Sequence, residues 1–299
     1  MIQKLDATIT FEKELADVPP LTEICDQEFE TKFNRSPFQI GHQLSGNELF
    51  SIERLLQLSR ELPKESVEYN PGDIEISHDP NLTPQNGLTV EETIERIQNC
   101  RSWMVLKNVE RSSPYGELLT ECLEQVRPFA EKVAGPMSNE QGFIFISSPG
   151  SVTPFHIDPE NNFLLQIRGS KEVWMFDQKD REVLKETEIE EFFSGSHRNL
   201  EFKDEYYAHG ERFELRPGQG LHFPVAAPHF VKNGPDVSVS FSITFQTKDS
   251  SDKQSLHRMN RQIRKFGLNP TDVGKSGWRD SVKLSLVRGM KLGRALLPK

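Results

Sequence analysis

The residue types best suited to chemistry stand in the segment Thr153-Pro154-Phe155-His156-Ile157-Asp158. Side chains at positions i and i+2 of a β-strand point to one face, so His156 and Asp158 can hold a single metal ion together. A third ligand has to come from elsewhere in the sheet, and His229, at the end of the segment 222–229, is the best candidate. Two imidazoles and one carboxylate leave three coordination positions open, as in the facial triad of non-heme Fe(II) oxygenases. Those positions suit a bidentate 2-oxo acid and dioxygen.

Simpler interpretations of these residues stay open. A lone His-x-Asp pattern is common by chance in surface turns, and His229 alone is compatible with a hydrogen-bonded core histidine. His222, seven residues before His229, is the nearest rival as a ligand, or it contacts a substrate instead. Apart from this rivalry, His222 and the other histidines lack such partners, and we interpret them as structural or exposed: His42, His78, His197, His209, His222 and His257.

Lys171 follows His156 by fifteen residues, directly after a Gly169-Ser170 turn. A lysine that lines a barrel between apolar strands is costly to bury without a counter-ion. The C5 carboxylate of 2-oxoglutarate is a counter-ion that such a position would fit. Two alternatives stay open: a surface lysine beside a turn, or Arg168 in the same role, although Arg168 differs in strand parity.

This arrangement of residues resembles a known family. The segment 150–158, Asn162-Phe163, residues 166–169 and Lys171 are similar to the JmjC-type Fe(II)/2-oxoglutarate dioxygenases of the cupin superfamily, and within it to asparaginyl hydroxylases and bacterial cupin-like proteins. The later segment with Pro217-Gly218, Leu221, Pro224 and His229 resembles the family's second metal-binding strand. The resemblance covers about residues 140 to 247.

The resemblance implies a double-stranded β-helix fold and assigns roles to five residues. It implies that His156, Asp158 and His229 are the Fe(II) ligands and so the catalytic residues. It further implies that Lys171 pairs with the distal carboxylate of 2-oxoglutarate and that the Thr153 hydroxyl donates to the same carboxylate.

Two further residues are placed near the cosubstrate by the resemblance. Asn162 matches an asparagine close to 2-oxoglutarate, and Ser242 falls where a relative carries asparagine, after a hairpin that is two residues shorter here. The implied activity is that of an oxygenase, a hydroxylase that uses Fe(II), 2-oxoglutarate and dioxygen and releases succinate and CO2. The alternative is a non-catalytic cupin-like module that binds a metal and binds or senses a small molecule. Lys171 and Thr153 favour the enzyme, because a plain binding barrel needs no cosubstrate anchor.

Departures from the family's pattern lie around the second metal-binding strand. The segment 226–228, Ala-Ala-Pro, stands where relatives often carry aromatic residues, and Gln219 replaces the usual aspartate. Neither change removes a ligand, so iron binding is expected, in a pocket that is wider or differently lined. The substrate, a small molecule or a peptide, stays open.

The secondary structure that the sequence predicts around these residues changes near residue 140, from a mixture of helices and strands to short strands. Before it, apolar spacing predicts helices over Asn47–Leu62 and Tyr115–Val133, a capping box at Thr89 predicts a helix to about Gln98, and Trp103–Val109 suits a strand. After it, short aromatic and β-branched segments alternate with turns: Gly142–Ser147, Phe163–Ile167, Glu172–Phe176, Arg212–Leu215 and Val237–Phe245. The pattern predicts a mainly β fold with flanking helices, and together with the resemblance a jelly-roll of the cupin/JmjC type with helical N-terminal and C-terminal additions.

We expect three regions along the chain. Residues 1–139 form a mixed helix and strand region that packs on the barrel, residues 140–247 form the barrel core, and residues 253–299 form a basic helical extension. The polar stretch 248–252 is expected to be a linker, and the acidic stretch 181–193 a surface helix or loop.

Charge is unevenly distributed over the 299 residues. The net charge is −9, but residues 253–299 hold 12 basic and 2 acidic residues, which gives +10 and leaves −19 for residues 1–252. The acidic body argues against broad binding of nucleic acid, and we expect the tail to dock on its own body or on a second copy. In the predicted helix Ser281–Leu297, one apolar stripe contains Val282, Leu286 and Met290. The resemblance implies a homodimer through such C-terminal helices.

Three absences in the sequence narrow the class of protein. No run of about 18 apolar residues predicts a membrane-spanning helix, and the first residues lack the pattern of a signal peptide. The cysteines, Cys25, Cys100 and Cys122, lack the spacing of a disulfide framework or a zinc cage. We therefore expect a cytoplasmic protein without a membrane partner.

Overall fold

The fold consists of two facing antiparallel sheets, described by a computed structural model for residues 19–77 and 87–295, with side chains described up to residue 290. The larger sheet has the strand order β1-β2-β10-β7-β12-β5-β4-β3. These strands are β1 Leu21–Thr22, β2 Gln39–His42, β3 Val67–Pro71, β4 Ser102–Lys107, β5 Met137–Ser147, β7 Asn161–Arg168, β10 Gln219–Phe223 and β12 Ser238–Thr247. The smaller sheet has the order β6-β11-β8-β9, with β6 Val152–His156, β8 Lys171–Phe176, β9 Gly210–Leu215 and β11 His229–Asn233.

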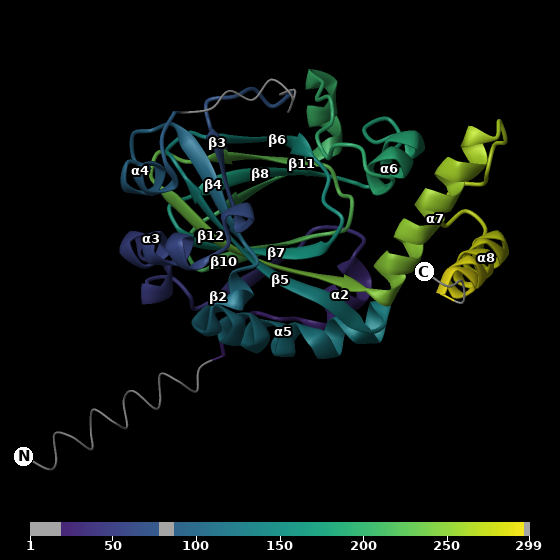
Figure 1. Cartoon of the computed structure of the whole chain (residues 1–299), viewed down its shortest axis with the longest axis horizontal. Coiled ribbons are helices and arrows are strands. Elements are labelled where there is room, and N and C mark those ends of the chain that lie inside the picture. The colour runs from purple at the N-terminus through teal and green to yellow at the C-terminus, as the bar shows by residue number, and fades with distance from the viewer. Residues whose placement is uncertain (1–18, 78–86, 296–299) are drawn as a thin grey trace, which may run out of the picture.

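From β5 to β12 the chain passes back and forth between the sheets: β5, β7, β10 and β12 lie in the larger one, and β6, the hairpin β8-β9 and β11 lie in the smaller one. Figure 1 shows the smaller sheet above the larger one, with helix α5 Ser113–Ala134 beneath the larger sheet. The predicted jelly-roll of mainly β structure with flanking helices is therefore confirmed.

Alternation along β12 shows how the sequence selects its two faces. Val239, Phe241, Ile243 and Phe245 are fully buried in the main hydrophobic core, which also contains buried side chains of α5. Ser238, Ser240, Ser242 and Thr244 point to the opposite face, toward the space between the sheets. The hydroxyl face of β12 therefore lines the inside of the barrel, while its apolar face packs in one core with side chains of the helix α5.

The remaining helices are α2 Asp26–Lys32, α3 Ile52–Glu61, α4 Val90–Glu95, α6 Glu186–Phe193, α7 Lys248–Lys265 and α8 Gly277–Ala295, with short 3-10 turns at 48–50, 64–66, 109–111 and 204–209. The predicted capping box is confirmed, because Glu92 N–H donates to Thr89 Oγ1 (3.2 Å) and Thr89 N–H donates to Glu92 Oε2 (3.0 Å). That helix ends at Glu95, three residues before the predicted end.

The predicted linker at 248–252 is wrong, because these residues form the first turn of α7. Thr247 caps the helix: its hydroxyl accepts from Ser250 N–H at 3.2 Å, and Ser250 Oγ accepts from Thr247 N–H at 2.9 Å. Polar side chains in the first turn of a helix accept hydrogen bonds from its free backbone N–H groups. Residues 248–252 are therefore polar, as residues of a linker also are, and the composition did not distinguish the two. Strand β12 therefore runs into the C-terminal helices without a break.

The N-terminal region also takes part in the barrel. Strands β3 and β4 extend the larger sheet beyond β5, and β1 and β2 extend it beyond β10. The region predicted at 1–139 thus supplies strands of the sheet itself, in addition to helices that cover it. Residues 1–18, 78–86 and 296–299, which include His78 and Leu297, lie outside the described residues. Within the described ranges, no helix has the length and apolar character needed to span a membrane.

Candidate metal centre

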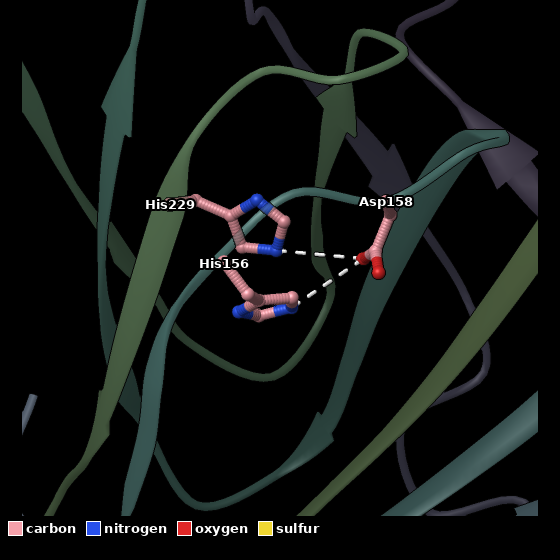
Figure 2. A group of neighbouring side chains, drawn as sticks. All are labelled: His156, Asp158 and His229. Carbon is pink, nitrogen blue, oxygen red and sulfur yellow. Dashed lines mark ion pairs between the residues drawn. The ribbon is translucent and has the colours of Figure 1, made fainter. Parts of the chain in front are cut away.

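Strands β6 and β11 bring the two histidines together. They are neighbours in the smaller sheet, and His229 pairs directly with His156. The ring centroids are 4.1 Å apart, and Asp158, two residues after β6 ends at His156, turns its carboxylate toward both rings (Figure 2). Asp158 Oδ2 lies 3.5 Å from His156 Nε2 and 3.5 Å from His229 Nε2. The three ligand atoms lie within 4.8 Å of one another, so one metal ion fits between them.

Hydrogen bonds at the far side of each ring fix which nitrogen faces the centre. His156 Nδ1 lies 2.6 Å from the Pro154 carbonyl oxygen, and His229 Nδ1 lies 2.9 Å from the Ala227 carbonyl oxygen. A carbonyl oxygen only accepts, so each Nδ1 carries the hydrogen and each Nε2 keeps a free lone pair. Backbone carbonyls orient metal-binding histidines in this way in known metal sites. Both rings are therefore prepared as ligands through Nε2.

Asp158 is held from its other side by Arg198, whose guanidinium donates to Oδ1 at 2.8 Å. Burial on its own would raise the pKa of the Asp158 carboxyl, but His156, Arg198 and His229 outweigh it and hold that pKa well below its ordinary value. Burial, reinforced by the neighbouring His156, lowers the pKa of His229 to about 3. At neutral pH the site therefore offers a charged carboxylate and a neutral His229 imidazole, which are the ligand forms that bind a divalent cation.

Lys171 is buried inside the barrel at the start of β8, with 5% of its surface exposed. Its neighbours on the same face of the smaller sheet are Val173 on β8 and Asn233 and Val231 on β11. Among the described residues, no carboxylate lies within ion-pair distance of its ammonium, and burial lowers the pKa of Lys171 to about 7. The alternative of a surface lysine is wrong, and Arg168, the rival residue, is exposed.

An irregularity in β6 places Thr153 on the same face as His156. The pairing partners of His156 and Thr153 are His229 and Val231, so two steps along β11 correspond to three steps along β6. Such a bulge changes the parity of a strand. Thr153 therefore points into the barrel although it lies an odd number of residues before His156. Thr153 and His156 both line a cavity of about 170 Å³.

Asn162 and Ser242 form a buried pair inside the larger sheet. The Ser242 hydroxyl donates to Asn162 Oδ1 at 2.7 Å. Together with Asp158, they line a second cavity of about 620 Å³, whose wall also contains Phe145 and Glu160. The structure thus brings Asn162 and Ser242 to a cavity at Asp158 that adjoins the Thr153 cavity, since Glu68 and Arg198 line both spaces.

His222, the rival ligand, faces away from the centre. Its ring is fully buried among Phe33, Phe38 and Phe163. His222 Nε2 accepts from the Asn34 backbone N–H at 3.1 Å, and Nδ1 donates to the Asn162 carbonyl at 3.2 Å. Burial lowers the pKa of His222 to about 3. It is a satisfied core histidine, so its interpretation as a structural residue is confirmed, and the rival role as a ligand or substrate contact is wrong.

Arg198 is the functional residue that sequence reasoning missed. It lies 40 residues after Asp158, in the irregular segment between α6 and β9. A lone arginine in such a segment has no spacing that would connect it with a metal ligand. The isolated bridge between His156 and Asn199 and the ring contact of Phe155 with Phe202 bring this segment against β6.

Comparisons with known proteins agree with the fold. A 102-residue segment, 32% of the chain, is 30% identical to Lysine-specific demethylase 8 of Danio rerio and spans about a quarter (24%) of that protein. The X-ray structure of E. coli ycfD matches with a TM-score of 0.53 and 14% identity over 94% of this chain and 70% of that one, which shows a shared fold. Residues 60–273 match the cupin-like domain, which extends the predicted range 140–247 in both directions. Because this match covers more than half of the sequence, the chain belongs to the cupin-like domain family.

Proposed function

We propose that the protein is an Fe(II)- and 2-oxoglutarate-dependent oxygenase that hydroxylates its substrate. The observation that carries the proposal is the combination of the His156, Asp158 and His229 cluster with a buried Lys171 that has no ion-pair partner among the described residues of the same barrel. A buried ammonium without a counter-ion is costly. A dicarboxylate that bridges the metal and the lysine removes that cost, and 2-oxoglutarate is such a molecule.

Fe(II) in this centre supplies the redox chemistry that couples conversion of 2-oxoglutarate and dioxygen into succinate and CO2 to hydroxylation of the substrate. His156 and His229 would hold the metal through Nε2, and Asp158 would hold it through Oδ2. Arg198 holds Asp158 through Oδ1 and so orients the carboxylate with Oδ2 toward the two rings. Three protein ligands of this kind would leave room on the metal for the cosubstrate and dioxygen.

Lys171 and Thr153 would hold the far carboxylate of 2-oxoglutarate, the lysine as an ion pair and the threonine as a hydroxyl donor. Both point into the barrel, because the pairing of β6, β8 and β11 turns them to its inner face. Asn162 and Ser242 lie in the wall of the larger cavity at Asp158. This cavity is the place at which a small molecule or a peptide side chain would meet the reacting centre.

The experiment that tests the function has an anaerobic and an aerobic part. Without oxygen, the protein loaded with Fe(II) should bind 2-oxoglutarate in calorimetric titration; with oxygen, it should form succinate slowly even without substrate. His156→Ala should lose both. Lys171→Met should keep the metal and lose 2-oxoglutarate, while Lys179→Met, at an exposed lysine, should behave as the wild type. Metal binding without any 2-oxoglutarate binding would favour the non-catalytic metal-binding module and overturn the proposal.

We further propose that the protein assembles as a homodimer through its C-terminal helices. Trp278, Val282, Leu286 and Met290 are exposed and follow one another at four-residue spacing along α8. Such spacing forms a single apolar stripe, and the basic tail complements the acidic body of a second copy. Leu286→Arg should convert a dimer into a monomer in size-exclusion chromatography with light scattering; an unchanged mass would contradict the interface. Cytoplasmic localisation also stays a prediction.

A further inference from the structure

A further cavity, of about 310 Å³, lies between helices α6 and α7 and the turn that joins β10 to β11. The two helices pack against each other beside the barrel (Figure 1). This α6–α7 cavity shares no lining residue with the cavities at Thr153 and at Asp158. Its volume is at the lower end of the range of about 300–1,000 Å³ that small-molecule sites have. The cavity is therefore large enough for a ligand of its own, apart from the metal centre.

The floor of the α6–α7 cavity is apolar. Ile189 and Phe193 come from one face of α6, and Val225 and Ala226 come from the turn between β10 and β11. Ile189, Phe193 and Ala226 are buried in one hydrophobic cluster, so the floor is part of a packed core. An apolar group that covers this floor is removed from water, and this favours its binding.

Basic side chains reach this cavity from separate segments of the chain. Among them, Arg35 follows α2, Arg181 lies between β8 and α6, and Lys253 lies on α7. No aspartate or glutamate is among the described residues that line the cavity, although the body of the protein is acidic. Cations that converge on one concave surface attract an anion more strongly than the same charges spread over a protein. The charge of this cavity is thus opposite to that of the body around it.

Two of these cations have carboxylate partners. Arg181 Nη2 lies 2.6 Å from Glu186 Oε2, and Lys253 Nζ lies 2.7 Å from Asp249 Oδ2. Neither carboxylate lines the cavity. The guanidinium of Arg35 donates to a backbone carbonyl at 3.2 Å and, within the described part of the chain, has no carboxylate partner. The three cations therefore exceed the two carboxylates beside them, and positive charge is left for the anionic group of a ligand.

His257 adds a buried polar side chain to the same wall. It has 8% of its surface exposed, and its ring stacks on Phe193 with 5.6 Å between the ring centroids. Nδ1 lies 3.2 Å from Glu186 Oε1, whereas Nε2 has no hydrogen-bond partner among the described residues. This nitrogen is therefore available to a ligand in the cavity as a hydrogen-bond partner.

We propose that the α6–α7 cavity binds a small organic anion with an apolar body, such as an aryl-substituted carboxylate. The carboxylate lies among Arg35, Arg181 and Lys253, and the apolar body covers the floor formed by α6 and the turn between β10 and β11. An anion without an apolar body leaves this floor uncovered, and a cation with the same body meets like charges. The site is separate from the metal centre, and the inference does not depend on the function proposed above.

Nuclear magnetic resonance of the protein labelled with 15N-alanine gives a direct test. The Ala226 backbone N–H, at the floor of the cavity, donates to the Asp158 carbonyl oxygen at 2.9 Å, and Ala226→Gly identifies its signal. Addition of 3-phenylpropionate should shift the Ala226 signal and leave those of Ala130 and Ala134, in α5, in place. The affinity should be the same with and without Zn(II). At equal concentration, acetate, which lacks the apolar body, and 3-phenylpropylamine, which has the opposite charge, should leave Ala226 in place.

Charge variants locate the anion. Arg35→Gln and Lys253→Gln should each weaken the binding of 3-phenylpropionate about fivefold, as loss of one partly exposed ion pair does. Lys64→Gln, at an exposed lysine before β3, is the matched control and should bind as the wild type does.

Three results would overturn the inference: no shift of the Ala226 signal, an equal shift with acetate or with the amine, or unchanged affinity in both Arg35→Gln and Lys253→Gln. Loss of binding in Lys171→Met would also overturn it, because the anion would then lie inside the barrel. None of these results bears on the proposed function, which the titration with 2-oxoglutarate tests.

Discussion

Replacement of Lys171 by methionine should stabilise the protein while it abolishes cosubstrate binding. Burial lowers the pKa of this lysine from its ordinary value of 10.5 to about 7. At about 1.4 kcal/mol for each factor of ten, the difference corresponds to about 5 kcal/mol by which the charged ammonium disfavours the folded state. Methionine has a similar length and no charge, so Lys171→Met should remove that cost.

The sign of the pH dependence follows from which state holds the proton. Below pH 7 Lys171 is protonated in both the folded and the unfolded state, and the folded state bears the full free-energy cost of the buried charge. Between pH 7 and 10.5 only the unfolded state keeps the proton, so the stability of the wild type rises with pH in that range. The advantage of Lys171→Met in the free energy of unfolding should therefore be about 5 kcal/mol at pH 6 and about 2 kcal/mol at pH 9.

Urea unfolding of the metal-free proteins at pH 6 and pH 9 measures this difference. The change of about 3 kcal/mol between the two pH values is the decisive quantity, because a packing effect of methionine adds equally at both. Lys179→Met, at an exposed lysine, controls for loss of one positive charge. An advantage that does not depend on pH, or a destabilised variant whose deficit is constant, would refute the assignment of a buried, uncompensated ammonium.

Three further predictions follow from contacts around the site and in the fold. Arg198→Gln should weaken metal affinity by roughly tenfold to a hundredfold, because loss of a residue that orients a metal ligand commonly has an effect of this size. A competition titration with a chromogenic chelator measures this affinity, and an unchanged value would contradict the role of the bond between Arg198 and Asp158. His222→Phe should make the free energy of unfolding less dependent on pH between about 6.5 and 3. In that range His222 takes up a proton in the unfolded state but not in the folded state, where it is buried. Urea unfolding at several pH values measures this, and parallel curves for the variant and the wild type would contradict it. Thr247→Ala should lower the free energy of unfolding by about 1 kcal/mol, because the variant loses the N-terminal cap of α7. Limited proteolysis of the wild type should leave residues 248–252 uncut, whereas rapid cleavage there would indicate a linker.

The local periodicities of the sequence were sufficient to predict much of the site. His156 and Asp158 are two residues apart, and the fifteen-residue step to Lys171 is one strand, a turn and the start of the next strand. Such spacings are local properties of the chain. The placement of Thr153 was implied only by the resemblance, since parity alone would put it on the other face, and the bulge in β6 is set by pairing with β11.

The features that sequence reasoning missed depend on contacts between distant segments. Arg198 reaches Asp158 from an irregular segment after α6, and β4, which pairs with β5, brings Val105 and Lys107 to the larger cavity at Asp158 from a region that composition places outside the barrel core. The start of α7 was missed for a different reason. Its first turn is polar because Thr247 and Ser250 satisfy backbone N–H groups there, and that composition is also typical of a linker.

The spacing along β8 supports a five-carbon diacid over a shorter one. Met175 pairs with His229 at the level of the metal centre, and Lys171 lies four residues earlier on the same strand. At about 3.3 Å per residue, their backbones are about 13 Å apart along the strand. The four-carbon stem of lysine covers part of that span, and a ligand that chelates the metal at one end has to cover the rest with its far carboxylate. A three-carbon diacid bound to the metal would not reach the ammonium and would leave it unpaired. Because a buried, unpaired ammonium is costly, Lys171 favours binding of the longer diacid.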